Sequence, residues 1–489
     1  MTILTDDVLL YVFDFYLEAS KVEAWHTLVH VCRRWRTIVF GSPRRLNLQI
    51  ACTNKSRVRE LLDVWPALPI VVLDNFKISH DNIKAVLEHH DRVCQIKLNV
   101  SNLAEVFTAL GASYPVLTDL ELLLFEVRPP GPFLPDPVKF LSGSSNLQSL
   151  SFIGIPVPGI PELLLSCTNL VNLHLKYIKY VPTPDLFSPD AIVTVLSTLT
   201  RLETLHLDLE SDLSSPDWEN RPLPLPTPTV LHSLIKLRFN GLIEYLDDLM
   251  ARIDAPLLYH LDIAIRTDYY QVIVFNTSQI PRFISHIPEF QALDEAHIGI
   301  DCYEFAAWIK FVSTRTASVV LKLDVISDNL GRQFSCLAQF CRSPAFPLPT
   351  LEYLCFSGGE HMECWHLDIE NIQWPELLQP FTSVKYLYLS KHFAQCIATA
   401  LEQLGGEIPT EVFPALENVL IEKSQLCGPV SEAFQNFAAM RQLSGHPIVV
   451  SDWDPVRSGP VRPGFLNQRV DRLQPVKILI GDDQLITVL

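Results

Sequence analysis

Residues 147–152 read LQSLSF, residues 170–175 read LVNLHL and residues 202–207 read LETLHL. Each stretch follows the pattern apolar-x-x-apolar-x-apolar, and such alternation is typical of a short β-strand with one buried face. The same pattern returns along most of the chain. Self-similarity of this kind must be interpreted before any single element is assigned, because it predicts a repeat architecture.

The copies of the pattern are spaced for a strand, a turn and a helix. Their middle apolar residues are Val71, Ile96, Leu120, Leu150, Leu173, Leu205, Leu237, Leu261, Ala296, Leu321, Leu354, Leu387 and Val419. Helical patterns fill the intervals, as in HDNIKAVLEHH at 80–90 and NLAEVFTALGASYP at 102–115. The sequence therefore predicts an α/β fold, in which a parallel sheet has helices behind it and stacked repeats form a solenoid.

Composition and charge narrow the possible partners. The chain has 489 residues, of which 48% are hydrophobic, which is enough for several domains or one stacked array. Acidic residues number 55 and basic residues 38, so the formal net charge is -17. Such an acidic chain would repel a phosphate backbone, and we expect no nucleic-acid partner. One basic stretch, residues 24–59, is the alternative candidate for such a patch.

Export and membrane insertion are not expected. The first residues, MTILTDDVLL, are acidic where a secretory signal would be basic, and charged residues or prolines interrupt every apolar stretch. The 11 cysteines lack paired spacings, which favours a reducing compartment, the cytoplasm or the nucleus.

The first sixty residues predict three short helices. In LTDDVLLYVFDFYL at 4–17, Thr5 is a good N-cap and apolar residues follow at helical spacing. A second helix is expected around Trp25 and a third around Trp35, ending before Gly41 and Pro43. Three helices of this size form too small a core to be stable alone, so a partner is expected to complete them.

These residues resemble a known family. LTDDVLLYVFDFYL and LVHVCRRWRTIVFGSPRRLNL are similar to the F-box, a three-helix module that docks on the Skp-type adaptor of cullin ubiquitin ligases, over Leu4 to Leu48. The resemblance implies the adaptor contacts Leu4, Val8, Leu9, Val12, Leu17, Leu28, Val31, Cys32 and Trp35. Thr5 replaces the family's usual proline. The alternative is that the same apolar residues belong to a helical cap of the repeat domain.

The repeats from about Leu68 to Ile421 resemble irregular leucine-rich repeats, which are common in fungal F-box proteins of this layout. The implied fold has the parallel sheet on its concave face and helices on its convex face. We expect an F-box-like module at 1–48, a partner-binding repeat domain at 49–453, and a C-terminal segment at 454–489 whose placement stays open. A helix ending at Gly445 and a strand at Ile448 to Val450 would cap the array.

The residues beside each middle apolar residue point to the opposite side of the sheet, the expected solvent-facing surface. The candidate substrate contacts on it are His174, His206, Lys236, Arg238, His260, His297, Lys322, Tyr353, Tyr386 and Tyr388. Basic and aromatic residues there favour an acidic or phosphorylated segment with an aromatic anchor. A solvated sheet surface without a ligand is the alternative.

No catalytic pattern is present in the sequence. It lacks GxSxG, HExxH, P-loop and dinucleotide-binding signatures. His361, Cys364 and His366 lack the fourth ligand and the spacing of a zinc site. The proline-rich stretches near Arg128, Ser214 and Ser343 are expected to connect repeats, although the second has a PxxP-like form.

Together these features predict a non-enzymatic, cofactor-free substrate receptor of a Skp–cullin–F-box ubiquitin ligase, acting in ubiquitin-dependent degradation. The N-terminal helices would hold the adaptor and through it the cullin, while the repeats would hold a protein substrate. The alternative is a repeat scaffold for protein–protein interaction without any role in ubiquitin transfer, and an enzyme using the histidines of the sheet ranks below both.

Overall fold

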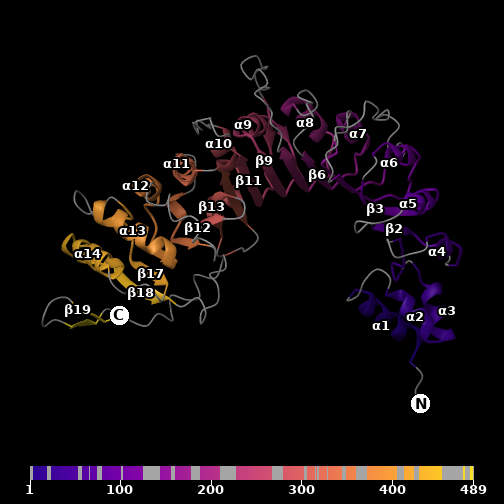
Figure 1. Ribbon diagram of the computed structural model, residues 1–489, viewed down its shortest axis with the longest axis horizontal. Helices are drawn as coiled ribbons and strands as arrows, with labels where there is room; N and C mark the ends of the chain where they lie inside the picture. Colours follow the sequence, from indigo (N-terminus) through magenta and orange to yellow (C-terminus); the bar gives the residue numbers. More distant parts are fainter. Residues whose placement is uncertain are drawn as a thin grey trace. The chain divides into compact units, whose positions relative to one another are not determined.

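The computed structural model (Figure 1) describes residues 4–18, 24–43, 45–52, 58–64, 67–73, 80–100, 103–124, 144–155, 160–177, 188–209, 227–266, 279–301, 305–313, 315, 319–327, 329–343, 348–358, 372–404, 412–422, 429–453, 477–479 and 485–487. Its internal contacts divide the chain into two compact units, Met1–Arg221 and Pro222–Leu489. The proline-rich stretch near Arg128, the one at 214–226 and the residues His361, Cys364 and His366 lie outside the described residues.

The first unit begins with three short helices at the expected places. They are α1 (Asp6–Glu18), α2 (Trp25–Val31) and α3 (Arg33–Gly41). Phe13 of α1 packs edge-on against Trp35 of α3, with ring centroids 4.8 Å apart. The indole nitrogen of Trp25 donates to the carbonyl of Gln49 at 2.8 Å, which ties the helices to the chain entering the first strand.

A parallel sheet follows in this unit, with its strands in sequence order. The strands are β1 (Ile50–Cys52), β2 (Ile70–Leu73), β3 (Val93–Asn99), β4 (Asp119–Leu123), β5 (Ser149–Ile153), β6 (Asn172–Tyr177) and β7 (Thr204–Leu209). The helices between them are α4 (Val58–Val64), α5 (His80–Leu87), α6 (Leu103–Ala109), α7 (Ile160–Ser166) and α8 (Pro189–Leu196), and Figure 1 shows them along one side of the strands.

The expected register of the repeats is confirmed within this sheet, apart from the first copy. Ile96, Leu120, Leu150, Leu173 and Leu205 pair in turn from β3 to β7 and are all buried. The assignment of Val71 as the first marker is wrong by one residue. An irregularity between Ile70 and Val71 shifts the pairing, so that Val72 is opposite Ile96.

The second unit contains a larger sheet that is mostly parallel. Its strands, in spatial order, are β9 (Lys236–Gly241), β11 (His260–Arg266), β14 (Val320–Ile326), β13 (Ala306–Val312), β12 (Glu295–Asp301), β15 (Tyr353–Gly358), β16 (Tyr386–Leu389), β17 (Asn418–Glu422) and β18 (Val449–Trp453). Two small sheets pair β8 (Thr229–Val230) with β10 (Ile253–Asp254) and β19 (Lys477–Leu479) with β20 (Leu485–Thr487).

Helices again accompany the strands of the second unit. They are α9 (Ile243–Arg252), α10 (Gln279–Ser285), α11 (Leu330–Cys341), α12 (Trp374–Leu378), α13 (Lys391–Leu404) and α14 (Pro429–Leu443), with 3-10 turns η3 (Pro288–Ala292) and η4 (Leu348–Thr350). Neighbouring helices pack on one another, and α13 contacts β15, β16 and β17. This side of the sheet therefore forms the apolar core of the unit.

The expected order of the strands is wrong in the middle of this sheet. The repeat pattern predicts that the strand of Ala296 follows that of Leu261, whereas Leu261 pairs with Leu321. Strand β13 lies between β14 and β12 and is antiparallel to both. The connections on either side of β13 are too short for a parallel crossover, which needs a dozen or more residues, so the chain returns as hairpins.

The C-terminal helix ends as expected at Gly445. The amide of His446 donates to the carbonyl of Arg441 at 2.9 Å, and Gly445 has φ +80, a left-handed conformation that glycine adopts without strain. The expected strand at 448–450 is β18, which pairs with β17 at the end of the sheet order. Among the described residues, no helix has the length and hydropathy required to cross a membrane.

Candidate functional site

Helix α1 has apolar side chains on two opposite sides. Successive side chains of an α-helix are about 100° apart around its axis, so the exposed apolar residues cover roughly 140° of its circumference. The members of this exposed side are Leu4, just before the helix, and Val8, Tyr11, Val12, Phe15 and Tyr16. The other side, formed by Leu9, Leu10 and Phe13, is buried against α2 and α3. An amphipathic surface helix normally has one such stripe, so the second is an additional apolar surface, and its members remain exposed in the part of the chain that the structure describes.

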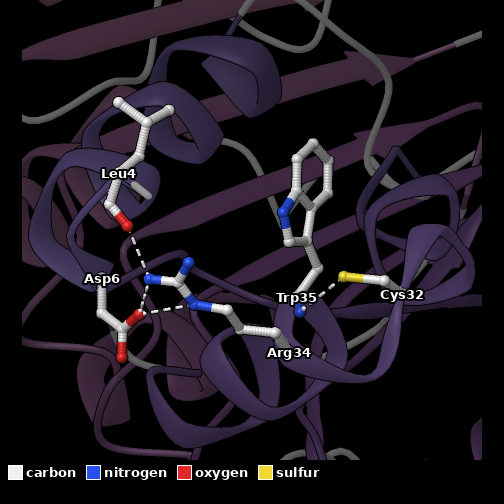
Figure 2. A network of polar contacts seen from close by, with 5 residues as sticks. All are labelled: Leu4, Asp6, Cys32, Arg34 and Trp35. Carbon is white, nitrogen blue, oxygen red and sulfur yellow. Dashed lines mark hydrogen bonds and ion pairs between the residues drawn. The ribbon is translucent and has the colours of Figure 1, made fainter. Parts of the chain in front are cut away.

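A polar network holds the start of α1 against α3 (Figure 2). The guanidinium of Arg34 donates to the carbonyl of Leu4 at 2.6 Å and to the carboxylate of Asp6 at 2.5 Å. Beside it, the amide of Trp35 donates to the Sγ of Cys32 at 3.5 Å, which caps the first turn of α3. The network fixes where the exposed side of α1 lies relative to Cys32.

The expected adaptor contacts fall into three groups. Leu4, Val8, Val12, Val31 and Cys32 are exposed, and Leu17 and Trp35 are partly exposed. Leu9 and Leu28 are each 5% exposed and form part of the core of the three helices.

Three exposed residues, Tyr11, Phe15 and Tyr16, were not among the predicted contacts. A helical projection of residues 4–16 would have found them, because they lie on the same side of α1 as Leu4 and Val8. The guanidinium of Arg45 lies 4.8 Å from the centre of the Tyr11 ring, a cation–π contact at the edge of this surface.

The expected substrate surface begins in the first unit with cross-strand pairs. His174 and His206 stack with ring centroids 4.0 Å apart, and His174 is hydrogen-bonded to Ser151 at 3.2 Å. Lys176 forms an ion pair with Asp208 at 2.7 Å. Charged and aromatic side chains on this side of the sheet therefore stabilise neighbouring strands.

In the second unit the same side of the sheet changes from exposed to buried along the strand order. Lys236 and Arg238 on β9 are exposed, while His260 on β11 and Lys322 on β14 are partly exposed. Arg238 forms an ion pair with Asp262 at 3.0 Å. Burial lowers the pKa of His260.

The expectation of a solvent-facing surface is wrong for His297, Tyr353 and Tyr388, which are buried. The ring of His297 is hydrogen-bonded to the buried carboxylate of Glu295. Tyr353 stacks on the partly buried Tyr386 with ring centroids 4.9 Å apart.

Tyr388 packs edge-on against Trp453 of β18, with ring centroids 6.2 Å apart. Cys355 and Leu420 complete this cluster. These side chains cover one another because aromatic residues on adjacent strands are close enough to pack laterally.

The described residues of neither unit contain a group of three or more histidine, cysteine, aspartate or glutamate side chains that could hold a metal ion. Burial raises the pKa of Cys336 to about 11 and also raises that of Cys355, so both thiols stay protonated near neutral pH. No known protein-family model matches the chain, and no curated protein matches its sequence significantly.

Proposed function

We propose that this chain is a substrate receptor of a Skp–cullin–F-box type ubiquitin ligase. The observation that carries the proposal is the exposed apolar side of α1, together with Val31 and Cys32. Burying one such side chain fully against a partner contributes about 1.5–3 kcal/mol, so several of them can anchor a stable interface.

The way α1 is held supports this proposal over a purely structural cap. A cap would place its apolar residues against the repeats, whereas Val8, Val12 and Phe15 face solvent while Leu10 and Phe13 already complete the core. Arg34 bonds both Leu4 and Asp6, so the exposed side is presented by a preorganised helix. Docking would then cost little conformational entropy.

The proposed division of labour assigns adaptor binding to α1–α3 and substrate binding to the sheet side opposite the helices. The chain would transfer no ubiquitin itself, and would act by bringing a substrate close to the conjugating enzyme in the cytoplasm or nucleus. Position 5, where the family has proline, has Thr5 with its carbonyl accepting from the amide of Leu9 at 3.1 Å, so the first helical turn forms without the proline.

Co-purification with a Skp-type adaptor tests this proposal. Val8→Asp places a charge on the exposed side of α1 and should abolish binding. Val116→Asp is a matched control, since Val116 is 41% exposed, Val8 is 43% exposed, and Val116 lies in a turn before β4. If both variants lose adaptor binding equally, or if the unaltered chain does not bind the adaptor, a repeat scaffold for protein–protein interaction would be the better interpretation.

A further inference from the structure

Two lysines lie side by side in the middle of the sheet of the second unit. One row of paired residues crosses β9, β11, β14, β13 and β12, and it consists of Arg238, Asp262, Lys322, Lys310 and His297. Arg238 and Asp262 are neighbours of opposite charge, whereas Lys322 and Lys310 are direct cross-strand neighbours of the same charge. Like charges directly opposite each other destabilise a sheet, so this pair needs an explanation other than stability.

The two lysines differ in their partners. Lys322 forms an ion pair with Asp324 at 2.7 Å. Among the described residues, none forms a hydrogen bond or ion pair with the ammonium group of Lys310, which is half-buried. Burial and the neighbouring charge of Lys322 lower the pKa of Lys310. A nearby anion would oppose both effects.

An aromatic side chain, that of Trp308, lies on the same strand as Lys310. Trp308 is two residues before Lys310 on β13, so both side chains lie on the same side of the sheet. The Trp308 ring lies over Gly299 of β12 so closely that a Cβ at Gly299 would clash with it. Gly299 therefore leaves room for the half-buried indole of Trp308 on the same side of the sheet as Lys310. A ligand with an anionic group next to an apolar group would suit these two side chains.

The charges around the lysines favour a monoanion. Asp262 forms an ion pair with Arg238, and Asp324 with Lys322, while the buried carboxylate of Glu295 is hydrogen-bonded to His297. Lys310 is the cation of this group whose ammonium group forms no ion pair with a described residue. The carboxylates of Asp262 and Glu295 also act on Lys310 and would repel a dianion such as a phosphate monoester. A single carboxylate would pair with the ammonium group of Lys310 and would be repelled less by these two side chains than a dianion.

We propose that Lys310, Lys322 and Trp308 form a recognition site for an aspartate or glutamate side chain of an acidic, unphosphorylated segment in the partner protein. The carboxylate would bridge the two ammonium groups, and a neighbouring apolar side chain would pack on Trp308. This deepens the proposed function and rests on it, since the segment would belong to the recruited substrate.

An array of short peptides of random flanking sequence, each synthesised with glutamate, glutamine or phosphoserine at its centre, tests the site. The full-length chain should bind the glutamate set at least about tenfold better than the glutamine set, as expected for one charge-assisted hydrogen bond. Lys310→Met removes the unmatched charge from a half-buried position, so the fold should be kept while the preference is lost. Lys97→Met is the matched control, because Lys97 pairs with Glu121 at 2.7 Å in the other unit.

The outcomes separate this inference from the proposed function. Stronger binding of the phosphoserine set would overturn the assignment to a carboxylate, and equal binding of all three sets would overturn the site. Adaptor co-purification from the same preparations reports on α1 alone. Lost adaptor binding with a retained glutamate preference would refute the ligase role only, whereas the reverse result would refute the carboxylate site only.

Discussion

Phe13 and Phe15 offer a matched pair of substitutions within one helix. Phe13 is 0% exposed and Phe15 is 75% exposed, although they are two residues apart on α1. Replacing each by alanine removes the same atoms from opposite sides of the helix. Stability should therefore fall in Phe13→Ala alone, whereas Phe15→Ala should weaken adaptor binding without a loss of stability.

Phe13→Ala should destabilise the three-helix segment by about 3–5 kcal/mol, the usual cost of emptying a buried phenylalanine site. It also removes the edge-on contact with Trp35 at 4.8 Å. Because so few helices share this core, the loss should unfold α1 locally while leaving the sheet of the same unit intact.

Phe15→Ala should leave stability almost unchanged, since little of that ring is buried in the free chain. In a complex with a Skp-type adaptor, covering the exposed part of the ring would contribute about 1–2 kcal/mol. The affinity should therefore fall by about 5- to 30-fold.

Hydrogen exchange of the α1 to α3 amides measures the first effect, and isothermal titration with the adaptor measures the second. Faster exchange in Phe13→Ala with native exchange in Phe15→Ala is the expected pattern. If Phe15→Ala loosens the helices as much as Phe13→Ala, or if it binds the adaptor with unchanged affinity, then the exposed side of α1 is not a docking surface.

Three further changes probe the fold and its charges. Gly299→Ala should lower stability by about 1–3 kcal/mol in chemical denaturation, because the new methyl group meets the Trp308 ring. Burial raises the pKa of Tyr353 to about 12. As the pH rises, the Tyr353 hydroxyl therefore ionises in the unfolded chain before it ionises in the folded chain. The contribution of this hydroxyl to the free energy of unfolding is complete below pH ~10 and is lost as the pH rises toward 12. Unfolding curves of Tyr353→Phe should lack this part of the alkaline decline. Arg34→Met should cost no more than about 1 kcal/mol globally, since its ion pair with Asp6 is exposed, yet amide exchange in the first turn of α1 should accelerate.

Much of the fold follows from local sequence. The alternation in LQSLSF and LVNLHL predicts strands whose markers Leu150 and Leu173 do pair in register. The three N-terminal helices and the end of α14 at Gly445 also follow from capping residues and periodicity. These features depend on short-range sterics and on which residues of a strand or helix are apolar, so they can be read from the residues alone.

The candidate sites were less predictable. Of the expected substrate contacts, Arg238 is exposed while His297 and Tyr388 are buried, because burial depends on side chains contributed by other strands. A helical projection places Phe15 on the side of α1 that carries Leu4 and Val8, but apolar residues on both sides of a helix do not reveal which side the core takes. That choice is made by the packing of α2 and α3.

The sequence by itself determined the repeating strands, the spacing of apolar residues within each and the helical start of the chain, because each depends on neighbours within a few residues. Only the tertiary structure decided the reversed order of β12, β13 and β14. Residues 306–311 of β13 read AAWIKF and also fit the repeat pattern, so the pattern does not show that this strand is antiparallel. Its direction is set by the short connections on either side. That reversal places Lys310 beside Lys322.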